Sequence, residues 1–151
     1  MPLSRRSLLP ALFAVICSSL VGAAEKPSPV PGKRVALRGY DPVSYFVNGR
    51  PEKGASEFWF AFDDAIYIFK NAEHRAAFIS DPERYAPQYD GFCAMTVSNG
   101  VKAEADPDAW LVVDGKLFVF RSKAGVAAFT KDSQASTSRA DSHWRSIKNA
   151  Q

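Results

Sequence analysis

Phe58, Phe60 and Phe62 alternate with Trp59 and Ala61, and this spacing of two between the phenylalanines predicts a β-strand. Two aspartates at 63–64 interrupt the pattern, and residues 65–69 predict a second strand that pairs with the first as a hairpin. Asn71 is a favourable N-cap for a helix that carries the apolar run 76–78. Residues 58–78 therefore predict a β-hairpin followed by a helix.

The same pattern returns 51 residues later without a gap. Residue class is kept at several positions, with Trp59 matching Trp110, Asp63 matching Asp114, Phe69 matching Phe120, and Ala76, Ala77 and Phe78 matching Ala127, Ala128 and Phe129. Asp114-Gly115 is a strong two-residue hairpin signal. Two such units are too few for a solenoid, so we expect a compact single α+β domain of two pseudo-symmetric β-hairpin-plus-helix units.

The segment 85–94 joins the two units. Pro87 and Gly91 predict a shaped loop here, and the loop ends close to Cys93. Upstream, Asp41-Pro42 predicts a turn into a short helical segment, and residues 140–144 predict a closing helix after a polar stretch.

The N-terminus predicts export. Arg5 and Arg6 precede an apolar run, and small residues follow it at 22–24, as in a cleaved signal peptide. We therefore interpret residues 1–24 as a signal peptide, 25–34 as a flexible linker and 35–147 as the folded domain. The two arginines leave general secretion and twin-arginine export both open.

Export decides how charge and cysteine content are interpreted. The mature protein is expected to be periplasmic or secreted, with no stable membrane anchor, and its charge falls by two from the formal value of +3 when Arg5 and Arg6 are removed. No basic cluster remains that would indicate nucleic-acid binding. Cys17 leaves with the leader, so Cys93 has no partner in the chain and is either buried, a ligand or a reactive thiol.

Several stretches resemble the YHS domain family over about residues 35–144. They are Gly39-Tyr40-Asp41-Pro42-Val43, Tyr67-Ile68-Phe69, the run 78–89, Gly91-Phe92-Cys93-Ala94, Asp106-Pro107 and Trp144. The chain is most similar to the exported branch, some members of which hold selenocysteine at the position of Cys93, and this implies a nucleophilic or redox role. The resemblance also implies metal binding in some branches, and it carries no general enzymatic activity.

Departures from the metal-binding pattern bear on that expectation. Those family members have cysteines after Asp-Pro-Val and around the strand-to-helix junction. This chain has Ser44 and Lys70 at those places, and His74 where a second cysteine would fall. The resemblance therefore favours the fold more strongly than metal binding.

The residues that remain as soft-metal ligands are Cys93, Met95 and His74. Copper(I) prefers sulfur and zinc prefers sets of Cys and His, so we expect copper or zinc if a metal is bound. Cys93 is expected near the surface of a pocket formed by the loop 85–94, the helix that carries His74, and Asp41-Pro42.

Three functions stay open from the sequence. The first is a YHS-type ligand-binding module with a soft metal near Cys93, the second a thiol-dependent redox protein, and the third a plain domain that binds an exported protein partner while Cys93 and Met95 fill the core. Whether the protein is an enzyme also stays open, although no Gly-x-Ser-x-Gly, phosphate-loop or His-Glu-x-x-His motif is present.

Overall fold

The computed structural model describes residues 29–150; the predicted signal peptide and the first four residues of the predicted linker lie outside the described residues. Helices and strands are both present, in agreement with the predicted α+β class. The elements follow one another as β1 (Arg34–Val35), η1 (Ala36–Gly39), α1 (Ser44–Val47), β2 (Trp59–Phe62), β3 (Ala65–Ile68), α2 (Ala72–Ser80), α3 (Pro82–Tyr85), η2 (Gln88–Gly91), α4 (Ala94–Val97), β4 (Asp106–Val113), β5 (Lys116–Phe120), α5 (Lys123–Lys131) and α6 (Ser133–Ile147).

The N-terminal part contains a three-stranded sheet in the order β1-β3-β2. β2 and β3 form the predicted antiparallel hairpin, with Trp59 opposite Ile68, and β1 runs parallel to β3. Asp63 adopts a positive φ of 52° in the turn, a conformation that aspartate tolerates better than most residues. The side chain of Asn71 accepts the backbone N–H of His74 and begins α2, as the sequence predicts.

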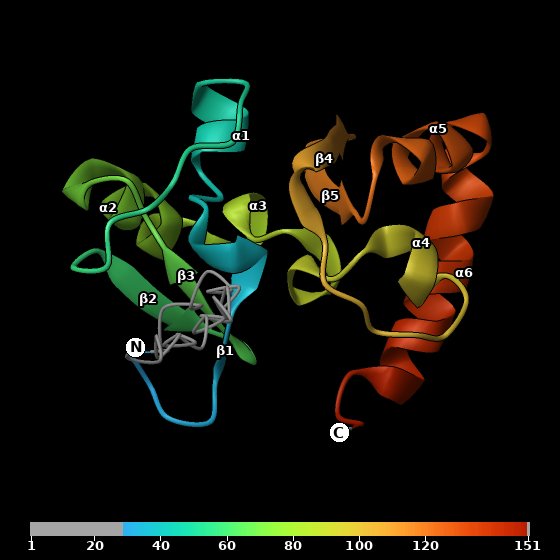
Figure 1. Cartoon of the computed structure of the whole chain (residues 1–151), viewed down its shortest axis with the longest axis horizontal. Coiled ribbons are helices and arrows are strands. Elements are labelled where there is room, and N and C mark those ends of the chain that lie inside the picture. The colour runs from blue at the N-terminus through green and yellow to red at the C-terminus, as the bar shows by residue number, and fades with distance from the viewer. Residues whose placement is uncertain (1–28, 151) are drawn as a thin grey trace, which may run out of the picture.

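The C-terminal part contains a two-stranded sheet of β4 and β5, joined by the predicted Asp114-Gly115 turn. Its register shifts between Asp106 and Trp110. Ser122 caps α5 through the N–H of Gly125. Figure 1 shows α1, α2 and the β1–β3 sheet on one side of the molecule, and β4, β5, α4, α5 and α6 on the other.

Two apolar clusters fill the interior, and β5 contributes to both. The N-terminal core gathers around Phe78 and Tyr67 and includes Leu117 and Val119, whereas the C-terminal core gathers around Phe129 and includes Phe118 and Phe120. Successive side chains of a strand point to opposite faces, so β5 has one face in each core. This explains why residues 117–120 are apolar without interruption, in place of the alternation of a half-buried strand.

Polar contacts also join the two parts. The hydroxyl of Tyr45, on α1, donates to the carbonyl of Pro107 at 2.9 Å, and its ring packs edge-on against Trp110. Burial raises the pKa of this hydroxyl, so Tyr45 stays a neutral donor. Arg34 bonds Glu104 and lies over the ring of Phe92 at 3.9 Å.

The last helix is longer than the sequence pattern predicts. The closing helix was expected at 140–144 after a polar stretch, but α6 begins at Ser133 and takes in that stretch. The side chain of Asp132 accepts the N–H of Ala135 at 3.0 Å, and this N-cap starts the helix early. Only two residues of α6, Ser136 and Ala140, are buried, so the sequence of this helix shows little apolar periodicity.

No helix within residues 29–150 is long and apolar enough to cross a membrane.

Candidate functional site

Cys93 lies inside the C-terminal core. Its N–H donates to the carbonyl of Ala103 at 2.9 Å, and it forms a parallel bridge with Val119 just before α4 begins. Only 2% of the residue is exposed, and it belongs to the apolar cluster of Phe118 and Phe129. The expectation of a thiol near a pocket surface is therefore wrong, because side chains of β5, α5 and α6 cover Cys93.

Within residues 29–150, no hydrogen bond links the three predicted ligands to one another. Met95 is half-buried against the same C-terminal core as Cys93. His74 is on α2, and no hydrogen bond joins it to either sulfur. Across the described part of the chain, no three His, Cys, Asp or Glu side chains are grouped so that they could hold a metal ion. The soft-metal site at these residues stays a prediction from the sequence.

His74 instead contacts Asp41, which is completely buried. The Asp41 Oδ1 atom accepts the N–H of Val43, and Oδ2 accepts the N–H of Lys70, both at 2.8 Å. Oδ2 also lies 2.6 Å from Nδ1 of His74. The carboxylate thus joins the start of α1, the end of β3 and the first turn of α2.

This geometry fixes how the imidazole is oriented. Oδ2 is an acceptor, so Nδ1 carries the hydrogen and Nε2 is the nitrogen left for other contacts. No hydrogen bond involves Nε2, yet among residues 29–150 every buried side-chain nitrogen or oxygen has a partner. Nε2 therefore reaches solvent, although the side chain is only 15% exposed. Carboxylate-oriented imidazoles of this kind are common in ligand-binding and proton-transfer sites.

The sequence analysis placed the helix of His74 and Asp41-Pro42 around one pocket, but it did not predict a contact between the two side chains. From the sequence, Asp41 is predicted to lie in a turn and His74 to be a metal ligand near Cys93. Thirty-three positions separate the two, and no local periodicity relates them. The one local signal is Asp-Pro-Val itself, because an Asp before a turn commonly accepts the N–H two residues on.

A second polar group surrounds Glu52 nearby. Its carboxylate accepts from Lys70 Nζ at 2.9 Å and from Ser44, Asn48 and Arg50 at 2.6–3.1 Å. These donors, with Lys70 the strongest, lower the pKa of Glu52 to about 2. Lys70 also donates its N–H to Asp41, so the two groups share a residue.

The lowered pKa predicts how stability depends on pH. A carboxyl group with a depressed folded-state pKa stabilises the fold above its ordinary value of 4.5, and this contribution disappears as the pH falls towards 2. We expect Glu52→Gln to lose stability at neutral pH and to match the wild type near pH 2, as measured by urea unfolding across pH. Glu57→Gln, at an exposed position, is the control. A constant Glu52→Gln deficit across that range would contradict the ion-pair explanation.

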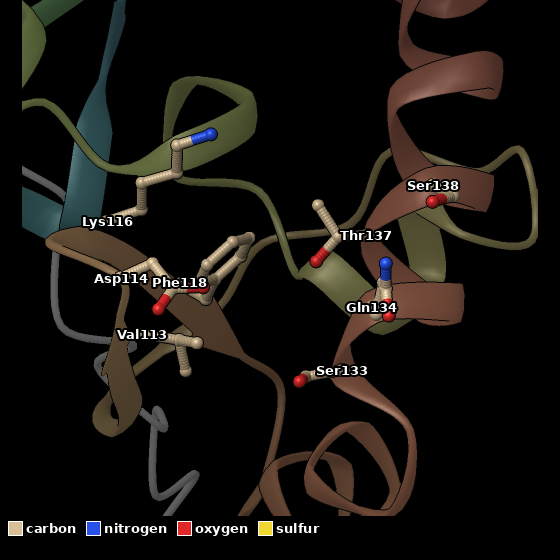
Figure 2. Close-up of a pocket in the computed structure, with 8 residues that line it drawn as sticks. All are labelled: Val113, Asp114, Lys116, Phe118, Ser133, Gln134, Thr137 and Ser138. Carbon is tan, nitrogen blue, oxygen red and sulfur yellow. The ribbon is translucent and has the colours of Figure 1, made fainter.

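A cleft lies between the β4–β5 hairpin and the first turns of α6 (Figure 2). Its volume is about 330 Å³, and its walls are formed by two groups of four residues, Val113, Asp114, Lys116 and Phe118 from the hairpin and Ser133, Gln134, Thr137 and Ser138 from the helix. Neither Cys93 nor His74 lines it. No sequence signal singled out this cleft, because its helical wall lies in the stretch read as a polar segment.

Comparisons with protein-family models, with curated proteins and with solved structures found no match for this chain.

Proposed function

We propose that the folded part is a YHS-type module of two pseudo-symmetric units. The turn at 37–39 has φ angles of 53°, 51° and 80°, and the turn at 89–91, 52 residues later, has φ angles of 57°, 53° and 78°. Helix caps recur at a spacing of 51, with Asn71 paired to Ser122 and Asp81 to Asp132. Such agreement at several independent positions supports an internal repeat.

When the two turns are aligned at their spacing of 52, Asp41 and Cys93 occupy equivalent positions. Asp41 donates its N–H to Glu52 at 2.8 Å, and Cys93 donates its N–H to Ala103 at 2.9 Å. Both residues directly follow an antiparallel bridge, made by Tyr40 in one case and Phe92 in the other. The position therefore anchors the chain in each unit, through a bonded carboxylate in the first and through apolar packing in the second.

We propose that the protein is an exported, non-catalytic binding module in which Cys93 is a packing residue. The burial of Cys93 in an aromatic cluster carries this proposal. A redox thiol needs access for its reaction partner, and a thiolate needs a polar or cationic environment. Among the polar groups that reach solvent, Nε2 of His74 and the polar walls of the cleft are suited to binding a ligand.

Thiol reactivity tests the role of Cys93. In a chain with Cys17→Ser, so that Cys93 is the sole cysteine, we expect a chromogenic disulfide reagent to react only as fast as the protein opens, and at full rate in urea. Cys93→Ser should lower the free energy of unfolding by about 1–3 kcal/mol, because its hydroxyl lies in an apolar site. Cys93→Ala, which adds no polar atom, is the matched comparison.

The same proteins separate the three functions. Fast modification of folded Cys93 would overturn the packing role in favour of redox chemistry. Stoichiometric copper(I) or zinc binding that Cys93→Ser abolishes, with stability unchanged, would restore the metal site. A slow thiol, no metal-dependent difference and a less stable Cys93→Ser protein agree with a binding module.

A further inference from the structure

The helical wall of the cleft between the β4–β5 hairpin and α6 carries polar side chains that have no hydrogen-bond partner among residues 29–150. Among the residues described, no hydrogen bond involves the side chains of Ser133, Gln134, Thr137 or Ser138. Hydroxyls on helices elsewhere often bond back to the preceding turn, as Thr130 does to Val126. Thr137 does not, although it is half-buried, and Figure 2 shows its side chain directed between the helix and the hairpin.

The chemistry of the walls indicates the kind of ligand. Asp114 and Lys116 contribute one charge of each sign, so the cleft has no net charge. The hydroxyl and amide groups of the helical wall both donate and accept hydrogen bonds. Val113 and Phe118 add an apolar part to the hairpin wall. Groups of these kinds suit a neutral ligand that has many hydroxyls and an apolar face.

In the first half of the chain, three of the four polar residues of the helical wall have apolar counterparts. The caps Asp81 and Asp132 fix the alignment at a spacing of 51. Ser133, Thr137 and Ser138 then correspond to Pro82, Ala86 and Pro87, while Gln134 corresponds to the polar Glu83. Ala86 and Pro87 are buried, and Ala86 belongs to the N-terminal core. The largely polar wall is therefore not repeated in the first half of the chain.

We propose that this cleft is a binding site for a neutral polyhydroxylated ligand, a mono- or disaccharide. The proposal rests on the protein being a binding module, and it names the ligand class of that module. A volume of about 330 Å³ is at the small end of the range for small-molecule sites, which is about 300–1,000 Å³, and suits one or two sugar rings. When a sugar binds, its hydroxyl groups replace their hydrogen bonds to water with hydrogen bonds to the side chains of the cleft.

The test is a titration of the full chain with glucose and maltose as probes, followed by amide NMR. We expect weak, saturable binding, with shifts concentrated at residues 113–118 and 133–138. Thr137→Ala removes one hydroxyl and introduces a better helix former, so the fold is retained. It should weaken binding about threefold to tenfold, as expected for the loss of one hydrogen bond. Ser142→Ala, at an exposed position of α6 outside the cleft, should leave affinity unchanged.

Each other outcome overturns the proposal. These outcomes are no saturable sugar binding at millimolar concentration, shifts away from the cleft, equal affinity of the wild type and Thr137→Ala, and stronger binding of inorganic phosphate than of either sugar at the cleft. None of these measurements depends on Cys93. The thiol and metal measurements decide the binding-module proposal, so its failure is distinguishable from failure of the sugar-binding proposal.

Discussion

Replacing Phe78 by alanine is expected to lower the free energy of unfolding by about 3–5 kcal/mol, because it removes a buried ring and leaves a cavity. Phe78 has no exposed surface, and the rings of Phe60, Phe62, Tyr67 and Phe69 have their centroids within 6.3 Å of its own. A loss of this size is a large part of the total stability of a small protein. Urea unfolding followed by tryptophan fluorescence measures it.

Two substitutions calibrate the Phe78→Ala result. Ile79→Ala changes the adjacent residue of α2, which is 42% exposed, and should cost far less. Phe129→Ala removes a buried ring that packs against Phe118 and Phe120, and should destabilise strongly as well. A Phe78→Ala loss no larger than that of Ile79→Ala would contradict the packing described for the N-terminal core.

Asp41→Ala is expected to destabilise the protein by about 3 kcal/mol or more, because removing an acceptor leaves buried donors without partners. The N–H groups of Val43 and Lys70 and the Nδ1 atom of His74 all lose their contact. Asp41→Asn keeps one carbonyl oxygen and should be milder. Thermal and urea unfolding at neutral pH compare the two variants with the wild type.

The control for Asp41 is Asp108→Ala, at an exposed position. His74→Ala removes the imidazole alone and leaves Asp41 its two backbone donors, so its cost should fall between those of Asp108→Ala and Asp41→Ala. If Asp41→Ala were as mild as Asp108→Ala, the carboxylate would not hold α1, β3 and α2 together.

Local sequence signals predicted much of the backbone. The hairpin turns at Asp63 and Asp114, the N-cap Asn71 and the short helix after Asp41-Pro42 depend on residues within a few positions of one another. Turn and cap chemistry acts over that range, so the sequence is informative there. The start of α6 was missed because an Asp cap begins a helix whose first turns contain few apolar residues.

The candidate site was less predictable because its contacts are not local. The Asp41–His74 contact spans 33 positions and depends on how α1 and α2 meet. The burial of Cys93 depends on β5 and α5, which follow it by more than 20 residues. The local sequence around a lone cysteine in a loop does not show whether that loop faces solvent or the core.

The strand β5 has a consequence for dividing the chain. Leu117 and Val119 complete the N-terminal core while Phe118 and Phe120 complete the other, so adjacent residues serve different halves. A fragment ending before Asp106 would keep the sheet β1–β3 but lose Leu117 and Val119 from its interior. A fragment beginning at Gln88 would keep β5 and leave the same two side chains in water. Two such fragments would need each other to fold, so this chain is suited to complementation between its halves and unsuited to truncation.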